Sequence, residues 1–382
     1  MLLQGTAMPP RDRTARRPSR TARPASQATR PLRAVDSPRN QRRSPAPAKP
    51  LRIPPLLQNV LRLLVLGVGL GVLAGSLIAA WEPNLKLAPT PQAATAAAPE
   101  PAVTTQPIAF QVPLTPLQTQ LAALIQQQPT LKAELFLTDL DTGNYVDING
   151  TTSIPAASTI KIPVLTALME AVQEGKVQLD EQLTMTKELV ASEAGAMQYQ
   201  PVGSKFTVLE SAIEMIRISD NTATNLLIAR LGGIEAVNQR FAAWGLETTR
   251  LRNLLPDLEG TNSTTPKEMV ELLAKIENGS LLKPRSRDRF FAVLRTTETN
   301  TLLSRGLGEE ATIAHKTGDI AMVVGDVGLI DMPNGKRYIA AMLVRRPDND
   351  LKANELIRQV SQRTYQFLNT LPVSTASTQQ PS

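Results

Sequence analysis

The feature that most limits what this chain can fold into is an uncharged, mostly apolar run of eighteen residues, from Leu63 to Ala80. Its length is near the minimum with which a helix can span a bilayer, and it lacks the polar face of a surface helix. Arg62 precedes the run and Trp81 follows it, which is typical of a membrane segment with a positive flank and an interfacial aromatic. The run predicts a transmembrane signal-anchor helix over residues 63–81, with a buried core helix as the alternative.

The arm before this run, residues 1–62, is rich in Arg, Pro, Ser and Ala and has no hydrophobic period, so we expect it to be disordered. It holds 13 Arg and one Lys against two Asp, a net charge of +12, whereas the remainder holds 27 basic and 32 acidic residues, a net of −5. The overall charge of +7 therefore gives no reason to expect nucleic-acid binding. Binding of the arm to anionic lipid or to a cytoplasmic partner stays open.

A basic arm before an apolar run predicts a single-pass protein of the inner (plasma) membrane, with a cytoplasmic N-terminus and a periplasmic folded part. Small residues downstream, at Ala94-Thr95-Ala96, leave cleavage of the anchor open. The chain has no cysteine, which excludes disulfides, a thiol nucleophile and a thiolate metal site.

The part after the membrane run divides by composition. Residues 82–112 repeat Pro, Ala and Thr and predict an extended linker; residues 113–370 predict one folded domain; residues 371–382 predict a disordered tail. Strand patterns lie at both ends of the folded part, at 133–139, 145–148, 313–316, 322–332 and 337–344, and helical spacing prevails between them. This arrangement predicts an α/β (α+β) fold: an antiparallel five-stranded sheet from both chain ends, flanked by helices, plus an inserted all-helical subdomain.

The clearest chemical signal is a serine followed three residues later by a lysine, Ser158 and Lys161, at the start of a helical pattern. Three residues are almost one helical turn, so the two side chains share a face and the amine can act as base to the alcohol. Taken alone, the pair is better explained by Ser158 as a helix cap and Lys161 as a solvated charge.

Two further runs change that balance, Ser219-Asp220-Asn221 and Lys316-Thr317-Gly318, because all three occurring in this order is improbable by chance. Together they resemble the three motifs of the active-site serine penicillin-recognising enzymes, and their context resembles the class A β-lactamases. The resemblance spans residues 115–370 and implies the class A β-lactamase or serine D,D-peptidase fold. The resemblance implies an enzyme that uses no cofactor and no metal.

The chemistry of these residues is coherent in its own right. Ser158 is the candidate nucleophile, Lys161 its base, and Ser219 a proton relay, while Lys316 lowers the basicity of the neighbouring amine. Three more residues predict substrate contacts: Asn221 to an amide oxygen, Thr317 with the Lys316 amine to a carboxylate, and Gly318 along the strand edge. In the family the oxyanion hole consists of backbone N–H groups, which correspond here to Ser158 and Asp319. The single histidine, His315, points to the other face of the strand and reads as structural.

One position departs from the class A pattern. Those enzymes carry Glu-x-x-Leu-Asn thirty-six residues after the serine of the second motif, and that glutamate activates the deacylating water. Here the count from Ser219 reaches Leu255, and Glu259 stands where the asparagine would be. Leucine cannot act as a base, so β-lactams should trap the protein. The register is supported by an expected capping box in which Thr265 and Glu268 begin the next helix.

This departure resembles the cyanobacterial penicillin-binding protein A group, D,D-peptidases on the class A fold that lack the deacylating glutamate. The resemblance implies a D,D-carboxypeptidase, monomeric in its catalytic domain, that acts on peptidoglycan stem peptides and is covalently inhibited by β-lactams. Tyr199 resembles the aromatic at the mouth of the family's cleft, and Arg337 is a candidate contact for a substrate carboxylate. Two alternatives stay open: a β-lactamase whose base has moved to Glu259, and a non-catalytic peptidoglycan or β-lactam sensor.

Overall fold

The computed structural model describes residues 110–372. The predicted arm (1–62), anchor (63–81), most of the linker and most of the tail lie outside the described residues. Within residues 110–372, no helix is both long and apolar enough to span a membrane.

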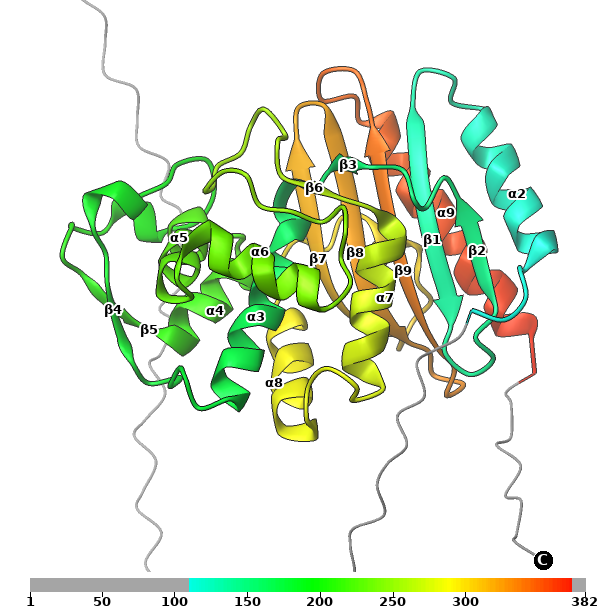
Figure 1. Cartoon of the computed structure of the whole chain (residues 1–382). Helices are drawn as coiled ribbons and strands as arrows, with labels where there is room; N and C mark the ends of the chain where they lie inside the picture. Colours follow the sequence, from blue (N-terminus) through cyan, green and yellow to red (C-terminus); the bar gives the residue numbers. More distant parts are fainter. Residues whose placement is uncertain (1–109, 373–382) are drawn as a thin grey trace, which may run out of the picture. The chain divides into compact units, whose positions relative to one another are not determined.

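A five-stranded antiparallel sheet joins the two ends of the described chain, as predicted (Figure 1). Its order from edge to edge is β2 (Tyr145–Ile148), β1 (Lys132–Asp139), β9 (Arg337–Arg345), β8 (Val323–Asp331) and β7 (Thr312–Ile320). The last two strands of the chain are joined at Asn334-Gly335, a dipeptide typical of hairpin turns, where Gly335 has a φ of +89°. The edge strand β7 runs four residues beyond the predicted strand, and this extension carries Thr317, Gly318 and Asp319.

Two helices cover one face of the sheet, α2 (Thr115–Gln126) and α9 (Lys352–Thr370). Leu117 and Leu121 of α2 share a buried cluster with Leu135 and Leu137 of β1. The helix begins at Thr115 with Leu114 at its N-cap; the sequence Thr115-Pro116 predicts Thr115 as the cap, one residue later. This cluster closes the back of the sheet, away from the inserted helices.

The inserted helices pack on the other face and extend beyond it (Figure 1). They are α3 (Lys161–Gln173), α4 (Val208–Arg217), α5 (Asn221–Arg230), α6 (Gly233–Ala243), α7 (Pro266–Glu277) and α8 (Pro284–Leu294). Short strand pairs brace the insertion, β3 (Ile154–Pro155) with β6 (Ser263–Thr264) and β4 (Gln182–Thr184) with β5 (Lys205–Thr207). α3 is buried on nearly every side, which explains the uniformly apolar sequence after Lys161.

The predicted capping box at α7 forms only in part. The Thr265 hydroxyl accepts the backbone N–H of Glu268, as expected. The carboxylate of Glu268 does not return to the cap; instead it accepts the backbone N–H groups of Glu247, Thr248 and Thr249. Because Glu268 is buried, its carboxylate requires several donors, and an otherwise irregular segment supplies them. Glu268 therefore anchors the chain between α6 and β6.

Candidate active site

The three runs that lie far apart in the sequence meet at one place in the fold. Ser158 lies in a 3-10 turn, η1 (Ala157–Ile160), which continues directly into α3 at Lys161. Ser219 lies in the turn before α5, and Lys316 lies on the edge strand β7. Ser158 is not a helix cap, since η1 begins after Ala156 and has no side-chain cap.

The amine of Lys161 is the centre of the cluster. Its Nζ lies 3.0 Å from Ser158 Oγ, 3.0 Å from Ser219 Oγ, 2.8 Å from the Ser219 carbonyl oxygen and 2.8 Å from Asn221 Oδ1. The two hydroxyls are 2.9 Å apart, with Ser219 donating to Ser158. An alcohol, a second alcohol and an amine in mutual contact form a short proton path.

Burial lowers the pKa of Lys161 well below its ordinary value, and the positive charge of Lys316 lowers it further, while the Asp220 carboxylate opposes the shift. A lysine with a depressed pKa spends time as a neutral amine at neutral pH, and a neutral amine can accept a proton. This meets the requirement for activating Ser158.

Two residues of this region adopt the left-handed backbone region. Ala157 has a φ of +45° and Ser219 a φ of +60°, although neither is glycine. Such conformations cost of order 1–3 kcal/mol and persist only where the surroundings hold them. At Ser219 the holding group is the buried carboxylate of Asp220, which accepts the backbone N–H of Ala223 and of Met197. The turn is thereby tied both to α5 and to the loop that carries Tyr199.

Lys316 is almost fully buried beside the same cluster. Burial lowers its pKa to about 8, with the carboxylate of Asp326 partly opposing the shift. Asp326 also contacts His315 Nδ1 at 2.8 Å, and His315 Nε2 lies 3.1 Å from Asn300 Oδ1. His315 therefore has a structural role on the far face of β7, as predicted, and a Ser-His-Asp triad with Ser158 is excluded.

Gly318 allows the edge strand to approach the serine. A Cβ at this position would lie 3.0 Å from the Ser158 backbone nitrogen and 3.0 Å from Ala157 Cβ. The strand and the 3-10 turn are thus in contact through their backbones, which brings the N–H of Ser158 and the residue after Gly318 to one place. This is the arrangement that an oxyanion hole formed by Ser158 and Asp319 requires.

Leu255 occupies the position where the class A pattern has its glutamate, and the structure buries its side chain. Its backbone is held at both ends by the side chain of Asn225, which donates to the Leu255 carbonyl at 2.8 Å and accepts its N–H at 2.9 Å. Asn225 lies one helical turn from Asn221 on α5, so both side chains share a face. Asn221 contacts the Lys161 amine, and Asn225 holds the backbone of Leu255.

The carboxylates near Leu255 are placed differently. Asp257 is buried, and its oxygens accept the backbone N–H groups of Thr261 and Asn262. Its role is therefore to close the loop. Glu259 is exposed to solvent, as expected of a loop charge.

The structure places the two predicted peripheral substrate contacts, Tyr199 and Arg337, differently. Tyr199 is 81% exposed on the 3-10 turn η3 (Met197–Tyr199), which Asp220 ties to the Ser219 turn. Arg337 is not brought to the cluster: it starts β9, opposite Asp331, at the end of the sheet remote from Lys316. There it forms ion pairs with Asp331 and Glu277. The prediction of a substrate carboxylate contact for Arg337 is therefore wrong.

Sequence reasoning missed Arg346, which follows β9 at the correct end of the sheet. Its buried guanidinium pairs with Asp319 and donates to the backbone carbonyls of Ile320 and Ala321. It thereby braces the end of the edge strand. The signal was weak, because Arg345 and Arg346 are adjacent and only the structure distinguishes them. Within residues 110–372, no group of His, Cys, Asp or Glu side chains is arranged to hold a metal ion.

Comparison with known proteins places this geometry in a family. Residues 116–368 match the model of the Beta-lactamase2 family, described as a β-lactamase enzyme family. The chain belongs to this family. A β-lactamase of Rhodobacter capsulatus is 30% identical over 216 residues, which are 53% of this chain and 72% of that protein. The β-lactamase structure from Sphaerobacter thermophilus is 28% identical, with a TM-score of 0.61 over 66% of this chain and 98% of that chain.

Two solved structures of PBP-A are more similar. Each is 54% identical to this chain, covers 68% of it and 98% of its own length, and has a TM-score of 0.67. One of them is a leucine-to-glutamate mutant, solved as an acyl-enzyme complex with penicillin G. The class A β-lactamase-like fold and the resemblance to the penicillin-binding protein A group are thus confirmed.

The two lysines predict a bell-shaped pH dependence of kcat/KM for acylation by penicillin. The rate should rise as Lys161 loses its proton and fall near pH 8 as Lys316 loses the charge that attracts a carboxylate. Lys316→Arg should move the falling limb to much higher pH, because a guanidinium keeps its proton. A falling limb at the same pH in both proteins would show that another group titrates there.

Proposed function

We propose that this protein is a serine D,D-peptidase, most simply a D,D-carboxypeptidase, that cleaves the terminal D-Ala-D-Ala bond of peptidoglycan stem peptides. The observation that carries the proposal is Leu255: a buried leucine whose backbone is clamped by Asn225, at the position where class A enzymes have their deacylating base. The enzyme can form an acyl-serine but lacks the carboxylate that would direct water onto a penicilloyl ester.

The contacts suggest a sequence of steps. Lys161, directly or through Ser219, takes the proton of Ser158, whose oxygen attacks the carbonyl carbon of the penultimate D-Ala. The backbone N–H groups of Ser158 and Asp319 would hold the oxyanion. The C–N bond then breaks, Ser219 returns the proton to the leaving amine, and D-Ala departs, leaving an ester.

The substrate contacts follow from the remaining residues. Lys316 and Thr317 would hold the terminal carboxylate, and Asn221 would donate to an amide oxygen of the stem peptide. Asn221 already donates its Nδ2 to the Ser192 carbonyl at 2.8 Å while its Oδ1 accepts from Lys161. Its amide orientation is therefore set before a substrate arrives. Tyr199 would contact the substrate at the mouth of the cleft.

Two other functions compete with this one. A β-lactamase with a relocated base would depend on Glu259, which is exposed and not directed by a hydrogen bond within the described residues. A non-catalytic sensor would need only to be acylated at Ser158, without release of a leaving amine. The proton path through Ser219, which serves a leaving amine, favours the peptidase over the sensor.

Ser158→Ala should abolish both covalent labelling by penicillin and D-Ala release from a stem-peptide mimic, because the nucleophile is removed. Mass spectrometry of the labelled protein and a D-Ala assay measure the two effects, with circular dichroism to check folding. Ser153→Ala, which changes an exposed serine on the approach to η1, is a matched control and should retain both activities. Labelling that survives in Ser158→Ala would mean that another serine is acylated.

Leu255→Glu should speed hydrolysis of the penicilloyl-enzyme, because it returns a carboxylate to a backbone position that Asn225 fixes. General-base catalysis sets a ceiling of about 10²- to 10⁴-fold. A smaller gain is expected, since the loop is not shaped for a charged side chain and Glu259 adds a second carboxylate nearby. The lifetime of the acyl-enzyme is to be measured in the wild type, Leu255→Glu, Glu259→Asn and the double mutant. Rapid hydrolysis by the wild type that Glu259→Asn alone stops would establish the β-lactamase instead.

The proposed site of action is the outer side of the plasma membrane, with residues 63–81 as the anchor. The support is the +12 arm followed by an eighteen-residue apolar run. Protease added to intact spheroplasts should digest the folded domain and spare the arm. Digestion of the arm alone would reverse the orientation.

A further inference from the structure

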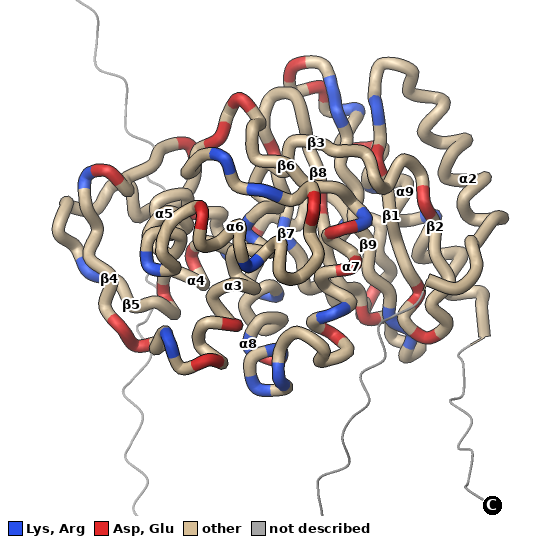
Figure 2. The backbone as a smooth tube through the Cα atoms, viewed as in Figure 1, with Lys and Arg blue, Asp and Glu red and all other residues tan. Residues whose placement is uncertain are grey.

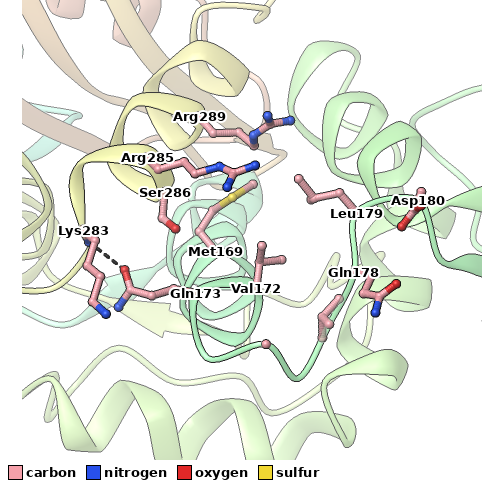
Figure 3. A pocket seen from close by; sticks show the side chains of 12 residues that line it. Met169, Val172, Gln173, Gln178, Leu179, Asp180, Lys283, Arg285, Ser286 and Arg289 are labelled. Atoms are coloured by element: carbon pink, nitrogen blue, oxygen red, sulfur yellow. Dashed lines mark hydrogen bonds between the residues drawn. The ribbon is translucent and has the colours of Figure 1, made fainter. Parts of the chain in front are cut away.

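A hollow of about 570 Å³ lies outside the candidate active site, between α3 and α8 (Figure 3). Met169 and Val172 of α3 form its apolar floor, and the residues that follow α3, from Gly175 to Asp180, form one wall. The first turns of α8 form the other wall. The backbone N–H of Lys283 donates to Gln173 Oε1 at 2.6 Å, which ties this wall to α3.

The α8 wall is basic. Lys283, Arg285 and Arg289 all line the hollow, and within the described residues none of them forms an ion pair. Asp180 is the one carboxylate among the lining residues. By contrast, Arg287 on the same helix is paired with Asp288. Figure 2 shows several basic positions on this helix.

The basic residues Lys283 and Arg285 lie at the N-terminus of α8, where positive charge destabilises a helix. The N-terminus of a helix carries a partial positive charge, which favours acidic residues and a side-chain cap. α8 has neither: Lys283 at its N-cap makes no side-chain cap, and the first turn contains no acidic residue. A local arrangement that opposes the ordinary preference, without compensation, is typical of a functional site.

A second observation points to a ligand. Ser286 is more than nine-tenths buried, lies next to Arg285 on the hollow side of α8, and directs its hydroxyl toward α3 and the hollow (Figure 3). Among the described residues, that hydroxyl has no hydrogen-bond partner. A hydroxyl that opens into the hollow beside two guanidinium groups, in the first turn of a helix, provides what an anionic group binds to.

Two further hollows lie next to this one. A second hollow of about 530 Å³ shares Arg285 and Arg289 with the first, and a third of about 370 Å³ shares Ile213 with the second. The third reaches Met197, whose backbone N–H donates to the Asp220 carboxylate beside Ser219. The three hollows are therefore neighbours along α8 and α4, and the third adjoins the loop that carries Tyr199.

We propose that the basic hollow binds free carboxylate groups of a peptidoglycan strand whose stem peptide is being processed at Ser158. The identity of the polymer rests on the proposed function, whereas the preference for an anion rests on the hollow alone. Met169 to Gln173 lie eight to twelve residues along α3 from Lys161, so about 12–18 Å separate the two places. A dipeptide cannot span that distance, but a strand that carries several stem peptides can.

The test is co-sedimentation of the full chain with peptidoglycan sacculi. The double variant Arg285→Gln, Arg289→Gln should bind about tenfold more weakly, because two charge-assisted contacts are removed. Arg287→Gln, on the same helix but outside the hollow, is the matched control and should bind like the wild type. Ser286→Ala should weaken binding without changing charge. Acylation by penicillin should stay unchanged in all three variants, which shows that they fold.

Sacculi whose carboxylates have been amidated should bind the wild type as weakly as untreated sacculi bind the double variant. Equal binding of the double variant and Arg287→Gln, or undiminished binding to amidated sacculi, would overturn the proposal. So would loss of binding to phosphatidylglycerol vesicles in the double variant with sacculus binding intact, since the ligand would then be a lipid phosphate. If the wild type releases no D-Ala yet the sacculus results hold, only the proposed function fails.

Discussion

The buried amine of Lys161 is the contact on which the rest of the site depends. Its four oxygen neighbours come from the 3-10 turn η1, from the turn before α5 and from α5 itself. An amine removed from water must be given hydrogen-bond partners, so the burial of Lys161 forces these segments to converge. The same burial lowers its pKa. One constraint thereby sets both the geometry and the basicity of the site.

Helix α5 connects the Lys161 amine to the loop that carries Leu255. Asn221 at its start contacts the Lys161 amine, and Asn225 one turn later holds the Leu255 backbone. Two side chains on one face of α5 thus fix the position of the Leu255 loop relative to the Lys161 amine, which contacts Ser158. A change from carboxylate to leucine at that loop alters the chemistry while leaving the backbone clamp in place. The same backbone clamp can therefore serve a loop with or without the carboxylate.

The edge strand makes a second, independent contact with the serine. Gly318 lets its backbone touch η1, and Arg346 braces the strand end through Asp319. The basic hollow at α8 lies on the helical side, at the other end of α3. α3 therefore links the two places, with the reactive amine in its first turn and apolar residues of the hollow in its last. The arrangement suits a substrate longer than the bond that is cleaved.

Much of the fold could be predicted from the sequence, because hydrophobic period and turn residues are local. The strands over residues 133–139 and 145–148 and the Thr265 cap of α7 need no distant partner to be recognised. The three motif runs could also be predicted to meet, since their order and spacing are improbable otherwise. Arg337, Arg346 and Glu268 could not be placed, because the partner of a long charged side chain depends on which end of the sheet or which loop lies beside it. The sequence by itself determined the elements and the reactive residue types. Only the tertiary structure decided which charges are buried and paired, and which, as at α8, have no ion-pair partner among residues 110–372. The physical reason is that burial and pairing depend on segments that lie far apart in the chain.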